Sequence, residues 1–82
     1  MSANDLRRRA HELDVTVWVG KAGLDPVVDE LDDQLKQRDL VKVKFLRAAR
    51  GGTTTEELAE ELAAEANATV FDVRGHTAVM RR

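Results

Sequence analysis

The stretch Val19-Gly20-Lys21-Ala22-Gly23-Leu24-Asp25-Pro26 predicts a sharp turn from a β-strand into an α-helix. The alternating run at residues 15–19 predicts the strand, and Asp25 as N-cap with Pro26 at the first helical position predicts the helix. Its two glycines allow positive φ and leave N–H groups uncovered, while Lys21 adds a cation. A basic glycine turn at a helix N-terminus can hold a phosphate. The alternative is a tight turn that simply needs glycine, because GxxG alone is a weak motif.

Outward from this turn, the sequence predicts the order helix, strand, helix, strand, helix, strand, strand. Leu6, Ala10 and Leu13 share one helical face near the start of the chain. Thr54 with Glu57 forms a capping box that opens the third helix, and Thr53 with Glu56 is the alternative pair. The predicted helices cover residues 2–13, 26–38 and 54–66, and the predicted strands cover 15–19, 40–45, 69–74 and 77–81, with Gly75-His76 as a hairpin turn.

The strand at residues 40–45 predicts which side of the sheet is covered. Val41, Val43 and Phe45 alternate with Lys42 and Lys44, so the apolar and the basic side chains lie on opposite faces. Helices over the apolar face would leave both lysines on the open face, about 7 Å apart along the strand. This spacing suits successive phosphates of a nucleic-acid backbone.

Trp18 is the only tryptophan, and alternation places it opposite the valines of the first strand. It could stack on a nucleic-acid base. It could instead cover a sheet edge or pack against the first helix, and this structural role is the favoured interpretation.

Strands separated by helices of about a dozen residues are typical of parallel neighbours, and the closing hairpin adds an antiparallel pair. The sequence therefore predicts one α/β (α+β) domain over residues 1–82, with a mixed four-stranded sheet and helices mainly on one face. Val28, Leu31 and Leu35 form the predicted inward stripe of the second helix. The predicted core joins residues of two strands and two helices: Val17, Leu31, Leu35, Val43, Leu58 and Leu62.

Composition excludes several classes of site. The chain has no cysteine and only two histidines, far apart in sequence, so disulfides and thiolate sites are excluded and a structural zinc site is not expected. We also expect no cofactor, no other metal and no small-molecule substrate. No apolar run approaches about 18 residues and the start is polar, which predicts a soluble, cytoplasmic protein without membrane contact.

Charge is unevenly distributed, although the net charge is only −2. Six acidic residues and no basic residue lie between Gly51 and Val73, in and after the third helix. The basic residues gather elsewhere, which predicts one acidic and one basic surface. The alternative is that both are ordinary solvated faces.

Several ordered motifs resemble one family over about residues 6–82. Val19–Leu24 followed by a helix, Leu40–Phe45, a capped helix and Val73–Met80 together resemble the YhbY/CRM (chloroplast RNA splicing and ribosome maturation) domain. The resemblance implies a fold similar to the C-terminal domain of bacterial translation initiation factor three. It also implies a non-enzymatic RNA-binding protein associated with large-subunit ribosome precursors. Arg74 and the ending Val79-Met80-Arg81 depart from the usual pattern, which leaves the details of the last hairpin open.

The leading hypothesis is a non-catalytic protein that binds ribosomal RNA during large-subunit assembly. The resemblance implies RNA contact at the GxxG turn, formed by Gly20, Lys21, Ala22 and Gly23, and basic residues extend the expected path: Lys42, Lys44, Arg47 and Arg50. An architectural DNA-binding protein and a protein-interaction module using the acidic helix are the alternatives. An enzyme is not expected, because His76 has no visible catalytic partner and the turn lacks the spacing of an NTP-binding loop.

Overall fold

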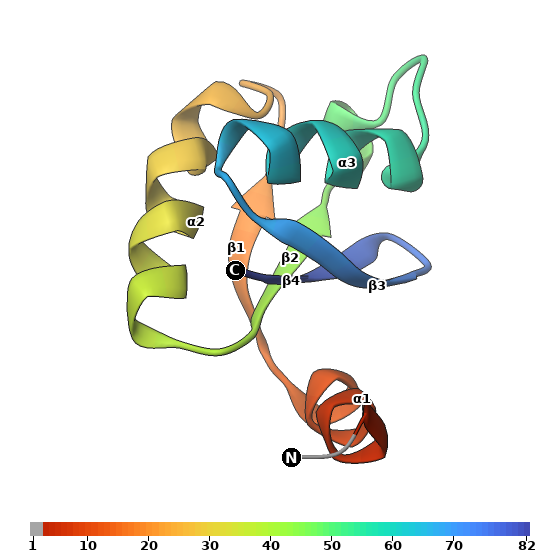
Figure 1. Ribbon diagram of the computed structural model, residues 1–82. Coiled ribbons are helices and arrows are strands. Elements are labelled where there is room, and N and C mark those ends of the chain that lie inside the picture. Colours follow the sequence, from red (N-terminus) through yellow and green to blue (C-terminus); the bar gives the residue numbers. More distant parts are fainter. Residues whose placement is uncertain (1–2) are drawn as a thin grey trace.

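The computed structural model describes residues 3–82, and the predicted order of elements is confirmed (Figure 1). Residue 2, where the first helix was predicted to start, lies outside the described residues. The helices are α1 (Ala3–Glu12), α2 (Asp25–Gln37) and α3 (Thr55–Glu65), with a 3-10 turn η1 (Arg47–Ala49); the strands are β1 (Val15–Val19), β2 (Val41–Phe45), β3 (Thr69–Arg74) and β4 (Thr77–Arg81). None of the helices in this described part is long and apolar enough to cross a membrane.

The four strands form one mixed sheet in the order β1-β2-β4-β3. β1 and β2 run parallel, because α2 connects them and returns the chain to the same end of the sheet. β4 lies antiparallel to both β2 and β3. Gly75, in the two-residue turn between β3 and β4, has a φ of 53°. The predicted α/β (α+β) fold with a mixed four-stranded sheet is therefore confirmed.

The main core lies between one face of the sheet and helices α2 and α3. α2 packs on β1 and β2, and α3 packs on β3 and β4. All six residues of the predicted core belong to this cluster. One detail of α2 was wrong: Val27 is buried and Val28 is only partly buried against the core. The alanines of α3 (Ala59, Ala63) are buried as well, which lets this helix approach the sheet closely.

α1 packs on the opposite face of the sheet, away from α2 and α3 (Figure 1). Its buried Ala10 contacts a small second cluster with Leu40 and Val79. Three partly buried side chains complete this cluster: Leu6, Leu13 and Phe71. Helices thus lie mainly on one face, as predicted, but α1 covers part of the face that carries the lysines.

The starts of α2 and α3 are built differently. Thr54 caps α3 as predicted, because its hydroxyl accepts the backbone N–H of Glu57 at 3.2 Å. The prediction for α2 was wrong: Asp25 is the first helical residue, and Leu24 occupies the N-cap position. Leucine offers no side-chain acceptor, so no side chain caps α2.

Candidate nucleic-acid interface

Three connections of the chain meet at one end of the sheet. They are the β1–α2 loop (residues 20–24), the β2–α3 connection (46–54) and the β3–β4 turn (75–76). Leu46 N–H donates to the Val19 carbonyl, and Phe45 N–H donates to the His76 carbonyl, both at 2.8 Å. The carboxyl ends of parallel strands share one edge of a sheet, which explains why the first two connections lie side by side. We call this edge the loop end.

The GxxG turn is a closed reverse turn at the loop end. Gly23 N–H donates to the Gly20 carbonyl at 3.0 Å, and Gly23 has a φ of 82°. Lys21 and Ala22 occupy the exposed tip, and their N–H groups take no part in this hydrogen bond. Only the second glycine adopts positive φ, whereas both were expected to be free to do so. A Cβ on Gly20 would lie 3.7 Å from the Leu46 side chain, which is an ordinary contact.

The N-terminus of α2 lies directly after this turn. Leu24 has helical φ and ψ (−80° and −32°), and its carbonyl accepts from Val27 N–H at 2.9 Å. The first turn of a helix presents partial positive charge, which favours a nearby anion. Asp25 stands in this same first turn and offsets part of that charge. A phosphate is therefore favoured beside the turn tip rather than on the helix axis.

The four other predicted basic residues differ in position. Lys44 and Arg47 are exposed at or next to the loop end. Arg50 is half-buried, and its Nε donates to the Phe45 carbonyl at 3.0 Å, so this arginine also fixes the β2–α3 connection. Lys42 lies further along β2 and is half-buried beside α1. The loop end thus gathers Lys21, Lys44, Arg47 and Arg50, whereas Lys42 lines a separate cleft.

The model of the CRS1/YhbY (CRM) domain matches residues 2–82. The chain belongs to this family. The resemblance inferred from the turn, the β2 pattern and the last hairpin is confirmed.

Two relatives of this CRM domain agree with that membership. A protein of Methanocaldococcus jannaschii, named "Probable RNA-binding protein", is 46% identical over 77 residues. The alignment covers 94% of this chain but only 58% of that relative's length. A solution structure from Staphylococcus aureus, of a hypothetical protein described as a candidate RNA-binding protein, has a TM-score of 0.75 and 31% identity. It covers 96% of this chain and 81% of the other.

The CRM domain also exposes residues that were not predicted as part of a site. Trp18 is 53% exposed and belongs to neither apolar cluster, so its predicted packing on the first helix is not observed, whereas a role in covering the β1 edge of the sheet stays a prediction. Leu46, at the loop end, is 39% exposed. Alternation already placed Trp18 opposite the valines. The missing information was that α1 covers the other half of this face and leaves the tryptophan uncovered.

A cleft of about 180 Å³ opens on the same face, between α1 and the sheet of this CRM domain. Ala10 and Val79 supply its apolar surface. Polar and charged residues complete the lining: His11, Lys42, Asp72, Arg74 and Thr77. Arg74 Nε lies 3.9 Å from Asp72 Oδ2, and both side chains are well exposed, so this ion pair is weak. No group of three or more metal-ligating side chains occurs within residues 3–82.

Proposed function

We propose that this CRM domain is a non-catalytic RNA-binding module. The observation that carries the proposal is the exposed GxxG turn at the loop end, where Lys21 stands beside the connection that carries Arg47. Family membership over nearly the whole chain and the names of two relatives support RNA as the ligand. The chain spans about three fifths of the curated relative, so the activity of the whole protein belongs to the proposal.

The turn supplies two kinds of phosphate contact. The N–H groups of Lys21 and Ala22 are available at the tip, and the ammonium of Lys21 adds a charge-assisted hydrogen bond. Lys44, Arg47 and the outer nitrogens of Arg50 extend the cationic path from the turn. Phosphate contacts position RNA without reading its sequence, so specificity would come from RNA shape or from unpaired bases.

The biological ligand we propose is ribosomal RNA during large-subunit assembly. This part of the proposal rests on the resemblance to single-domain family members alone. The acidic helix α3 lies on the face of the sheet opposite α1 and bears five glutamates. It would repel a phosphate backbone, so the RNA is expected to stay at the loop end and on the α1 face.

The direct test measures the affinity of the purified chain for a structured RNA and for duplex DNA of equal length, over a series of salt concentrations. We expect tighter binding to RNA and an affinity that falls as salt increases, because phosphate contacts release counterions. Preference for the DNA duplex would favour the architectural DNA-binding alternative. A salt slope near zero would contradict phosphate contacts and favour a protein-interaction module.

A further inference from the structure

Four residues form a continuous row across the sheet. Trp18 of β1 is the register partner of Lys44 of β2, Lys44 is the partner of Thr77 of β4, and Thr77 is the partner of Arg74 of β3. Directly opposed residues in neighbouring strands share a face. With strands about 4.8 Å apart, this Trp18–Lys44–Thr77–Arg74 row extends over about 14 Å.

The row lies on the sheet face that α2 and α3 leave open. The residues flanking it on β2, Val43 and Phe45, are buried against the other face. α1 packs against the row's own face at Leu40 and Val79, which lie further from the loop end. Trp18 and Lys44 therefore lie on the open strip between α1 and the loop end, while Thr77 and Arg74 line the cleft beside α1. A 53% exposed indole on such a strip contributes little to core packing.

The chemistry of the row is an aromatic ring, a hydroxyl and two cations. Lys44 is exposed, and Arg74 has Asp72 as an exposed ion-pair partner at 3.9 Å. The acidic helix α3 packs on the opposite face. α2 also packs its apolar side there, but its Gln34 contacts both Thr16 of β1 and Glu30, so one carboxylate lies near the Trp18 end of the row. Single-strand binding surfaces combine stacking rings with cations that follow the backbone. A protein partner would be expected to require a larger apolar patch than one tryptophan.

We infer that the Trp18–Lys44–Thr77–Arg74 row is a binding site for an unpaired RNA segment, in which one base stacks on the indole of Trp18. The neighbouring phosphates contact Lys44 and Arg74. Trp18 lies two residues before Gly20, so a strand held at the GxxG turn continues directly onto the row. The inference rests on the proposed function, because it identifies unpaired RNA as the class of ligand.

The first experiment uses Trp18 itself, since no second tryptophan obscures its fluorescence. The chain is titrated with a short unstructured RNA oligonucleotide and with the same sequence as a fully paired RNA duplex. Binding is measured independently from the anisotropy of a dye on the RNA. We expect the single strand to quench and shift the tryptophan emission as it binds, and the duplex to change the emission much less.

The second experiment uses variants at the row. Trp18→Ala should lower the affinity for the single strand about 5- to 150-fold, the range expected from losing one stacked base. Trp18→Phe should recover part of this loss because it keeps an aromatic ring. Gln37→Ala, which shortens an exposed side chain at the C-terminal end of α2 and away from the loop end, is the control and should bind as the parent does. Thermal melting checks that each variant is folded.

The outcomes separate the two proposals. If the parent binds the labelled RNA while its tryptophan emission stays constant, the row is not the site. Equal single-strand affinity of Trp18→Ala and the parent would also overturn the inference and leave the RNA-binding proposal standing. Failure of the parent to bind any RNA, measured by anisotropy, would overturn the proposed function and the inference with it.

Discussion

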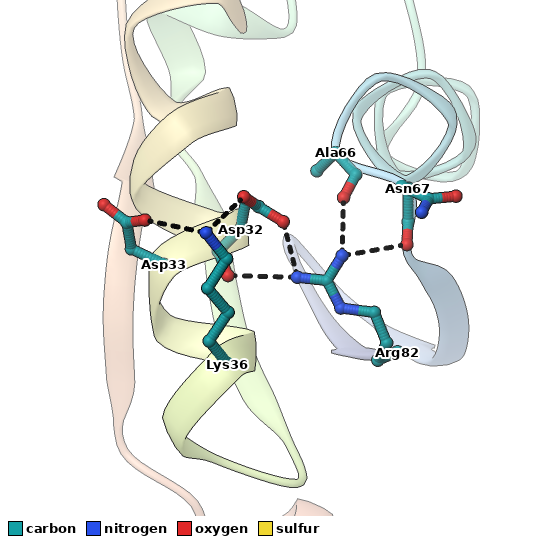
Figure 2. Close-up of polar contacts among 6 residues, drawn as sticks. All are labelled: Asp32, Asp33, Lys36, Ala66, Asn67 and Arg82. Carbon is teal, nitrogen blue, oxygen red and sulfur yellow. Dashed lines mark hydrogen bonds and ion pairs between the residues drawn. The ribbon is translucent and has the colours of Figure 1, made fainter.

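Arg82 binds Asp32 twice, through the carboxylate and through the backbone carbonyl at 3.0 Å (Figure 2). The other terminal nitrogen of Arg82 donates to the carbonyls of Ala66 and Asn67, both at 3.4 Å. Lys36 lies 3.4 Å from the same Asp32 carboxylate, as Figure 2 also shows. This arginine therefore ties the end of β4 to the middle of α2 and to the end of α3.

This contact predicts a specific response to acid. The hydrogen bond from Arg82 is the main reason why the pKa of Asp32 lies below its ordinary value, with Lys36 acting in the same direction. A carboxyl whose pKa is lower in the folded state stabilises the fold above its unfolded pKa, and this stability disappears as pH falls through the folded value. Arg82→Gln should therefore reduce the loss of unfolding free energy between neutral and acidic pH.

Urea unfolding at a series of pH values measures this effect. Arg81→Gln is the matched control, because the neighbouring arginine is exposed and its removal changes net charge equally. We expect the unfolding free energy of the Arg81 variant to depend on pH as the parent's does. The unfolding free energy of the Arg82 variant should fall less as the pH becomes acidic. Identical acid sensitivity of all three proteins would contradict this assignment.

The second prediction concerns the packing of α3. Leu62 is completely buried between this helix and the sheet. Leu62→Ala should lower the free energy of unfolding by about 2–5 kcal/mol, through lost apolar burial and the cavity left behind. Such a loss is a large share of the stability of a domain this small. A loss below about 1 kcal/mol in denaturant titration would mean that α3 does not pack as described.

The third prediction separates two arginines of the β2–α3 connection. Arg47 is exposed, whereas Arg50 also donates to the Phe45 carbonyl. Arg47→Ala should weaken RNA binding and leave the melting temperature unchanged. Arg50→Ala should weaken binding and also lower the melting temperature, because the partly buried Phe45 carbonyl loses the hydrogen bond from Arg50 Nε. Equal melting of the two variants would show that the Arg50 hydrogen bond does not stabilise the connection.

Local alternation made the sheet predictable from the sequence. In β2, three apolar residues alternate with two lysines, and the period of two assigns each to a face without knowledge of the rest of the chain. The capping box of α3 was equally local, because Thr54 and Glu57 lie within one helical turn. Both predictions were confirmed for that reason.

Features that depend on more distant packing were harder to predict. From the sequence, Asp25 and Pro26 fit either the N-cap and the first helical position or the first two helical positions. The structure shows the latter, because Leu24 occupies the N-cap position and the helix begins at Asp25. The apolar stripe of α1 was recognised, but its side of the sheet depends on the path of the chain after Glu12. The exposure of Trp18 follows from that path and could not be read from the sequence. The roles of the proposed RNA-binding residues remain predictions.

The most direct test of the RNA-binding account substitutes the tip of the GxxG turn and measures RNA affinity against salt. Lys21→Ala should weaken binding about equally for different RNA sequences and lower the salt slope by about one, as for a single lost phosphate contact. Ala22→Asp should weaken binding more, because it puts a negative charge where the phosphate is expected and keeps both glycines. Lys36→Ala on α2 is the control, since it removes the same charge away from the turn.

Thermal melting first establishes that all three variants are folded like the parent. The account then predicts the weakest binding for Ala22→Asp, intermediate binding with a reduced salt slope for Lys21→Ala, and parental binding for Lys36→Ala. If the two turn variants bind RNA with the parent's affinity and salt slope, the GxxG turn does not anchor RNA in this protein.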